Sequence, residues 1–91
     1  MSADDPREAI VAAARRLDAA GFVPTKSGNL SVRTPRGFWI TPSGLPYAAM
    51  EAGDCVECGP GGAVVSGNRR PSSEWRLHAA IYAARADAAA V

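Results

Sequence analysis

The stretch LSVRTPRGFWIT, residues 30–41, predicts a β-hairpin. Residues 30–33 alternate apolar and polar side chains, as a half-buried strand does. Residues 34–37 (TPRG) have the composition of a turn, and residues 38–41 (FWIT) continue as a second strand. The chain therefore contains at least one antiparallel strand pair.

One helix is predicted before this hairpin and another near the end of the chain. Asp5 is a helix N-cap residue that is followed by proline and, three residues on, by glutamate, which predicts a helix over 6–20. Gly21 lies where such a helix ends in a left-handed residue. The sequence PSS at 71–73 introduces a second helix that runs to about Arg85.

The segments between and after these elements predict further sheet structure. Residues 54–58 and 63–65 flank a Gly-Pro-Gly-Gly turn and predict a second hairpin, and residues 47–52 are expected to form one short helical turn. The apolar run AAAV at 88–91 resembles the opening of a strand, with nothing after it. We therefore interpret Val91 as a truncation point inside a larger domain.

Composition excludes several classes of protein. A chain of 91 residues is enough for one small domain, and its net charge of +1 is not that of a strongly basic nucleic-acid module. No apolar run approaches the length needed to span a bilayer, and the N-terminus has no secretory pattern. The two cysteines are too few for a disulfide framework, which favours the cytoplasm. We expect neither a nucleic acid nor a membrane as a partner.

Three polar segments are candidates for anion binding: SGN at 27–29, TPSG at 41–44 and PSSE at 71–74. Each offers backbone N–H groups without bulky side chains, and the third opens a predicted helix, whose N-terminus attracts anions. The same residue types also form ordinary turns, and on spacing alone that interpretation is favoured. Neither a G-x-x-x-x-G-K-[ST] nor a G-x-G-x-x-G string is present.

Glu74 and His78 are candidates for chemistry on the second helix. Glu74 either complements the helix dipole or acts as a carboxylate that moves a proton beside an anion site, and the residues alone leave both open. His78 follows four residues later, on the same face. Because two ligands make an incomplete metal site, a hydrogen-bonded histidine of the half-core is the favoured interpretation.

Cys55 and Cys58 form a Cys-x-x-Cys string without a second ligand pair. Positions three apart on a strand point to opposite faces, so the thiols are expected to diverge. We interpret both as structural cysteines.

Taken together, SGNLSVR (27–33), ITPSGLPY (40–47) and PSSEWRLH (71–78) resemble the class II aldolase/adducin family, most closely its L-fuculose-phosphate aldolase branch. The resemblance implies an α/β/α sandwich around a mainly antiparallel sheet. Residues 1–91 would be the N-terminal portion of one such domain, whose C-terminal part is absent. The family's assembly is typically a homotetramer.

The resemblance also assigns roles to residues. Glu74 would be the acid/base carboxylate, and the phosphate of the substrate would be bound by Gly28, Asn29, Ser43, Gly44, Ser72 and Ser73. The implied reaction is zinc-dependent cleavage of an L-fuculose-1-phosphate-like ketose phosphate into dihydroxyacetone phosphate and an aldehyde. An epimerase or dehydratase of the same fold, and a non-catalytic adducin-like assembly module, are the alternatives.

The zinc ligands of the family are not among these residues. Family members place a His-x-His pair just after the strand that begins near Ala88, and a third histidine much further on. This chain ends at Val91, and its one histidine is His78. We therefore expect no metal ligand within the chain, zinc only in a full-length parent, and no activity from the 91 residues alone.

Overall fold

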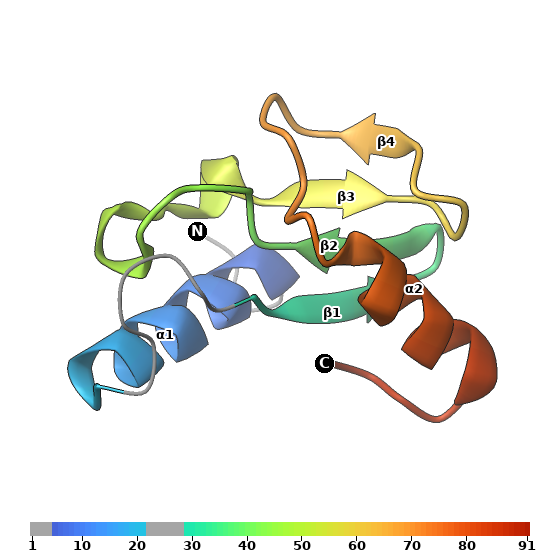
Figure 1. The fold of residues 1–91 in the computed structure, drawn as a ribbon, viewed down its shortest axis with the longest axis horizontal. Helices are drawn as coiled ribbons and strands as arrows, with labels where there is room; N and C mark the ends of the chain where they lie inside the picture. Colours follow the sequence, from blue (N-terminus) through green and yellow to red (C-terminus); the bar gives the residue numbers. More distant parts are fainter. Residues whose placement is uncertain (1–4, 22–28) are drawn as a thin grey trace.

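Two hairpins and two helices build the computed structural model, which describes residues 5–21 and 29–91 (Figure 1). The helices are α1 (Pro6–Ala19) and α2 (Trp75–Ala84), the 3₁₀ turns are η1 (Tyr47–Ala49) and η2 (Ala52–Asp54), and the strands are β1 (Ser31–Thr34), β2 (Gly37–Ile40), β3 (Val56–Cys58) and β4 (Val64–Ser66). The strands form an antiparallel sheet in the order β1-β2-β3-β4. In this described part, no helix is long and apolar enough to cross a membrane.

Helix α1 begins and ends as its sequence predicts. The Asp5 carboxylate accepts a hydrogen bond of 3.0 Å from the backbone N–H of Arg7, and Pro6 occupies the first helical position. The chain leaves the helix through Gly21, whose φ of +79° lies in the left-handed region. The helix predicted over 6–20 is thus confirmed.

The β1–β2 hairpin is confirmed as well, with β1 shifted one residue toward the C-terminus. Ser31 pairs with Ile40, and Thr34 pairs with Gly37 at the turn. Gly37 packs against the next strand so closely that a Cβ there would lie 1.9 Å from the carbonyl oxygen of Cys58. Glycine is therefore required at the point where the hairpin meets β3.

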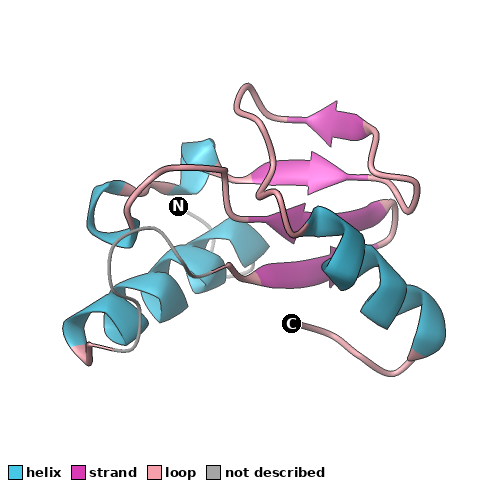
Figure 2. Cartoon of the chain, viewed as in Figure 1, coloured by secondary structure: helices cyan, strands magenta, loops and turns pink. Residues whose placement is uncertain are grey.

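Each face of the sheet is covered by one helix (Figure 2). On one face, Val32 and Trp39 pack against the core cluster of α1, whose buried members are Ile10, Val11, Ala14, Tyr47, Met50 and Cys55. On the other face, Tyr82 of α2 packs into a second cluster, whose other buried members are Phe38, Ile40, Val56 and Cys58. This layering agrees with the expected α/β/α sandwich.

The region between the hairpins differs in one respect from the prediction. Instead of one helical turn over 47–52, the chain forms two 3₁₀ turns, and Gly53 lies inside the second one rather than ending the first. The extended Met50 and Glu51 separate the two turns, and the Glu51 and Asp54 side chains each bond the other residue's backbone N–H. The second hairpin is present as β3 and β4.

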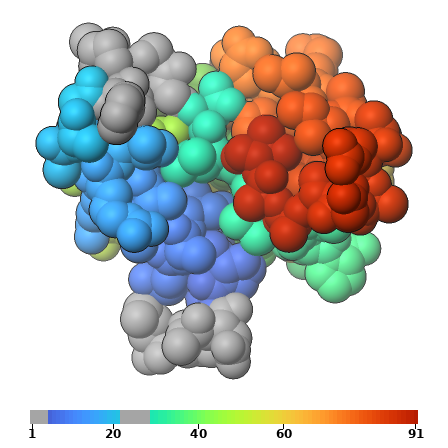
Figure 3. Space-filling model, turned by 90° about the horizontal axis from the view of Figure 1, so that it is seen from below, coloured from blue at the N-terminus to red at the C-terminus, as the bar shows by residue number. Residues whose placement is uncertain are grey.

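The last residues lie along the outer edge of β1 (Figure 1). Val32 and Ala90 form an antiparallel bridge, and the Arg33 N–H donates to the carbonyl oxygen of Ala89 over 2.8 Å. The strand-like character expected at 88–91 is thus confirmed. Seen from below, the blue surface of α1 and the red C-terminal segment lie to either side of β1 (Figure 3).

Candidate active site

Thr41, which follows β2 directly, joins the three candidate segments. Its backbone N–H donates to the Leu30 carbonyl oxygen (3.0 Å), and its Oγ1 accepts from the Leu30 N–H (3.2 Å). Its own carbonyl oxygen accepts from the Ser72 N–H (2.9 Å). A second link joins the Ser43 N–H to the Arg70 carbonyl oxygen (2.9 Å). The segments therefore meet at the open end of the β1–β2 hairpin.

Five of the predicted phosphate ligands belong to the described residues at this junction, and we call the surface that they form the rim: Asn29, Ser43, Gly44, Ser72 and Ser73. Ser72 is 7% exposed and Asn29 is half-buried, whereas Ser43, Gly44 and Ser73 are exposed. Gly28 lies outside the described residues. The structure thus brings together segments that are more than forty residues apart in sequence, while the role of these residues as ligands stays a prediction.

Gly44 gives this rim an open backbone. Its φ of +74° lies in the left-handed region, and a Cβ built on it would meet no atom within 4 Å. The conformation favours glycine, and the space in front of it is empty of protein. An anion can therefore approach the main chain here.

Helix α2 starts at the same rim. The Ser72 Oγ accepts from the Glu74 N–H (3.2 Å), and the Ser72 carbonyl oxygen accepts from the Trp75 N–H (3.1 Å). Ser72 therefore caps a first turn, and Trp75 is the first residue of the helix proper. The exposed Glu74 lies in this turn, beside the candidate phosphate ligands Ser72 and Ser73.

His78 lies below the rim and is 1% exposed. Its Nδ1 is 2.6 Å from the Ser31 Oγ, and its Nε2 is 2.5 Å from the Asn29 Oδ1. The Ser31 Oγ is in turn 2.7 Å from the Tyr82 hydroxyl. The interpretation of His78 as a hydrogen-bonded core residue is confirmed.

Burial keeps this histidine neutral. Loss of hydration lowers the pKa of His78, and the nearby Glu74 carboxylate opposes that effect only partly. A neutral imidazole has one donor nitrogen and one acceptor nitrogen, so one of its two hydrogen bonds is donated and the other is accepted.

Ser31 is a site residue that sequence reasoning missed, whereas Thr41 lay in the candidate segment 41–44 without a role of its own. Both are 1% exposed and hold the segments together from within. Ser31 stood at a position that strand alternation assigned to the polar side. Its position opposite Ile40 on a sheet covered on both faces is what buries it. The sequence shows only a serine two residues after Asn29, and a serine there does not indicate a buried hydrogen bond unless its partner His78 is known.

The described residues do not fit a zinc site. In residues 5–21 and 29–91, no group of three or more His, Cys, Asp or Glu side chains could hold a metal ion. Cys55 and Cys58 belong to the clusters on opposite faces of the sheet, as expected, and both are free and buried. Burial raises the pKa of Cys55 to about 11 and also raises that of Cys58, so both thiols stay protonated.

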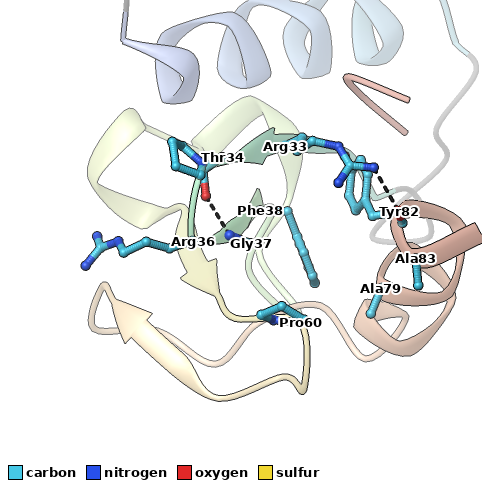
Figure 4. Close-up of a pocket in the computed structure, with 10 residues that line it drawn as sticks. Arg33, Thr34, Arg36, Gly37, Phe38, Pro60, Ala79, Tyr82 and Ala83 are labelled. Carbon is cyan, nitrogen blue, oxygen red and sulfur yellow. Dashed lines mark hydrogen bonds between the residues drawn. The ribbon is translucent and has the colours of Figure 1, made fainter. Parts of the chain in front are cut away.

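A cavity of about 230 Å³ lies away from the rim, at the closed end of the hairpin (Figure 4). Gly37, Phe38 and Pro60 line it, together with Ala79 and Tyr82 of α2. None of the predicted phosphate ligands is among its lining residues. The candidate site is therefore an open surface site that is separate from this cavity.

Comparison with known proteins identifies the family. The model of the Class II Aldolase and Adducin N-terminal domain matches residues 8–91, and the chain belongs to this family. A 5-methylthioribulose-1-phosphate/5-deoxyribulose-1-phosphate aldolase of Rhodospirillum rubrum is 44% identical over 85 residues, which are 93% of this chain and 38% of that protein. A methylthioribulose-1-phosphate dehydratase of Acidiphilium cryptum is 40% identical over 74 residues, 80% of this chain and 35% of that protein.

The L-fuculose branch is represented among both sequences and structures. The L-fuculose phosphate aldolase of Escherichia coli (strain K12) is 45% identical over 65 residues, 71% of this chain and 30% of that protein. A solved L-fuculose 1-phosphate aldolase superposes with a TM-score of 0.89 at 33% identity, covering 99% of this chain and 43% of that one. The fold class is confirmed. The chain spans less than half the length of these relatives.

Proposed function

We propose that these residues form the phosphate-binding and proton-transfer part of an enzyme that cleaves or dehydrates a ketose 1-phosphate. We call the longer protein that would contain them the parent enzyme. One observation supports this most: Thr41 joins three separate segments at one rim, in a chain whose relatives are named for phosphorylated ketoses. The parent would be a cytoplasmic homotetramer.

In this proposal the substrate phosphate lies on the rim. Gly44 admits it to the main chain, and Ser43, Ser72 and Ser73 donate from their hydroxyls, together with Gly28 and Asn29. The backbone N–H groups of Ser43 and Ser72 are already bonded to Arg70 and Thr41. The first turn of α2 adds the partial positive charge of a helix N-terminus. Several neutral donors around an anion bind it without a buried cation.

Glu74 would move the proton. Aldol cleavage and dehydration of a ketose 1-phosphate both change bonding at the carbon next to the ketone carbonyl. Cleavage takes the proton from the hydroxyl on the neighbouring carbon, breaks the carbon–carbon bond so that this neighbour leaves as an aldehyde, and adds a proton to the carbon next to the ketone. Dehydration removes the proton from the same carbon and expels the neighbouring hydroxyl as water. An exposed carboxylate beside the phosphate rim can serve in either reaction.

Of these two reactions, we propose aldol cleavage of an L-fuculose-1-phosphate-like ketose phosphate, which yields dihydroxyacetone phosphate and an aldehyde. The 45% identity to an L-fuculose phosphate aldolase supports it. Dehydration is the second candidate, because a methylthioribulose-1-phosphate dehydratase is similar over 80% of this chain. Because the described residues do not fit zinc, its ligands would come from outside this chain, and no step above depends on it.

The test is a product assay of the parent enzyme. Purified parent is incubated with L-fuculose 1-phosphate or 5-methylthioribulose 1-phosphate, and dihydroxyacetone phosphate is measured against the dehydrated diketone phosphate. Aldol cleavage predicts the triose phosphate, and dehydration predicts the diketone. The matched ketoses without phosphate are the controls. The proposal would be contradicted by a parent that converts the ketoses with and without phosphate equally well. It would also be contradicted by a parent that oligomerises but converts neither of the two ketose phosphates.

A further inference from the structure

Asn29 is connected to the interior of the sheet by a chain of three side chains. Asn29 contacts His78, His78 contacts Ser31, and Ser31 contacts Tyr82, over distances of 2.5, 2.6 and 2.7 Å. His78, Ser31 and Tyr82 are 1%, 1% and 6% exposed. Asn29, half-buried at the rim, is the end of the chain that reaches the candidate site.

The hydrogen bonds of this chain run in one direction. The Asn29 Oδ1 can only accept, so the His78 Nε2 carries the proton and donates to it. Because the ring is neutral, its Nδ1 then accepts from the Ser31 hydroxyl. The Ser31 oxygen has then used its proton, so Tyr82 donates to it. With the Asn29 Oδ1 against the ring, each ring nitrogen has one role, and the Ser31 hydroxyl both donates and accepts.

This direction goes with one orientation of the Asn29 carboxamide. With Oδ1 bound to the ring, the Nδ2 group lies on the other arm of the planar amide and presents its two donors away from His78. With the amide flipped, the ring would take its other tautomer, every hydrogen bond of the chain would reverse, and Asn29 would present the acceptor Oδ1 away from His78. A phosphate needs donors, and only the observed orientation supplies them.

We propose that His78 is a positioning residue, which holds the Asn29 amide with its donors toward the substrate phosphate through the Tyr82–Ser31–His78 chain. The inference rests on the proposed function, because it assumes that Asn29 binds phosphate. It adds a link between the two parts of the site, since Glu74 is the N-cap residue of α2 and His78 lies in the first turn of the same helix. One helix thereby sets the proton-transfer group and the anion donor together.

The first test compares His78→Leu with His78→Gln in the parent enzyme. Leucine removes the donor to Asn29, so KM for the ketose phosphate and the inhibition constant of inorganic phosphate should rise about tenfold, the cost of one such hydrogen bond. Because the reacting carbon is not involved, kcat should change far less. Glutamine keeps an N–H donor of similar reach and should restore most of the binding.

A matched control separates positioning from general destabilisation. Glu57→Gln also alters a buried hydrogen-bonded side chain, but at the far end of the hairpin. It should lower the melting temperature and leave both phosphate constants unchanged. If His78→Leu does not fold, Ser31→Ala removes the donor to Nδ1 together with the acceptor for the Tyr82 hydroxyl, but keeps the imidazole. It should weaken phosphate inhibition about threefold, as the loss of half the free energy of one hydrogen bond would.

The outcomes distinguish the two proposals. If the wild-type parent is not inhibited by phosphate and ignores the phosphate of its substrate, the proposed function fails. If the wild type binds phosphate but folded His78→Leu, or folded Ser31→Ala in its place, binds it equally well, only the positioning role fails. A rise in KM that His78→Gln does not reverse would also overturn it, because the donor would then not be what matters.

Discussion

The two ends of the β1–β2 hairpin each bury a polar cluster, and the two clusters differ in charge. At the closed end, Glu57 is 3% exposed and accepts hydrogen bonds from Thr34 Oγ1 (2.7 Å) and the Arg36 guanidinium (2.5 Å). The Thr34 oxygen also accepts from the Gly37 N–H (3.0 Å). This end contains a charged group whose partners all belong to the hairpin and its neighbouring strand.

At the open end, the buried groups are neutral and their chain of hydrogen bonds ends at the surface. His78 and Ser31 are satisfied internally, but the last member, Asn29, reaches the rim. In the proposed function, the closed, charged cluster stabilises the turn, whereas the open, neutral one orients Asn29 toward a ligand. The contrast would then separate residues that hold the structure from residues that serve the site.

The largest expected effect is that of Glu74→Gln on turnover. The amide keeps the size of the side chain but cannot accept a proton, so kcat of the parent should fall about 10²–10⁴-fold. Binding of inorganic phosphate should stay within about twofold, because the change removes no phosphate donor. Steady-state kinetics with phosphate inhibition measure both. Unchanged turnover would remove Glu74 from proton transfer.

The matched change at the closed end, Glu57→Gln, should lower stability and leave turnover unchanged. Glu57→Gln removes the charge that faces Arg36, and we expect a loss of about 1–2 kcal/mol in the free energy of unfolding without a change in kcat. Urea unfolding of the parent provides the measurement. The comparison between the two ends fails if the two glutamines affect turnover alike.

Gly37→Ala at the closed end should lower the free energy of unfolding more than Glu57→Gln does. Its Cβ would overlap the carbonyl oxygen of Cys58, so β2 and β3 would have to separate. We expect a loss of about 3 kcal/mol in the free energy of unfolding, at the upper end of overpacking costs. Chemical denaturation of the parent tests it, and a variant as stable as the wild type would show that the strands do not approach so closely.

The fold could be predicted from the sequence because its signals are local. The Asp5-Pro6 cap, the Gly21 terminus and the turn at 34–37 each specify their own backbone conformation. The number of turns over 47–54 could not be predicted, because it depends on hydrogen bonds between Glu51 and Asp54 that no periodicity reveals.

The site could be predicted only as far as its segments. The polar composition at 41–44 and 71–74 indicated an anion site or a turn, and the family resemblance favoured the first. What neither could give are the hydrogen-bond partners of Thr41, Ser31 and His78, because these contacts join β1 and β2 to the start of α2 across more than thirty residues. Long-range hydrogen bonds of this kind have no signature within a single segment.

A smaller effect is expected from Gly44→Ala at the open end. The left-handed φ strains alanine by about 1 kcal/mol, but nothing in the protein is close enough to clash. The added methyl group would lie where the phosphate approaches, so inhibition by inorganic phosphate should weaken about tenfold or more, the worth of one displaced hydrogen bond. Denaturation and inhibition assays on the same variant measure both. Unchanged phosphate binding would place the anion away from Gly44.

The smallest effect concerns pH at the open end. Because the pKa of His78 is lower in the folded chain than its ordinary 6.5, the unfolded chain takes up a proton at a pH where the folded one does not. The contribution of His78 to the free energy of unfolding should therefore be constant above about pH 6.5, the ordinary pKa of histidine, and fall as the pH decreases below it. The Glu74 carboxylate is the charged group that opposes this shift. The aspartates with lowered pKa values lose stabilisation only below about 3.8, so they do not mask the effect.

The measurement is the difference in unfolding free energy between wild-type parent and His78→Gln from pH 7.5 to 5. Glutamine does not titrate, so the difference should shrink on acidification, as the wild type loses stability that the variant cannot lose. A difference independent of pH would mean that His78 accepts a proton without breaking its bond to Ser31. The open end would then resemble the closed one in tolerating a buried charge.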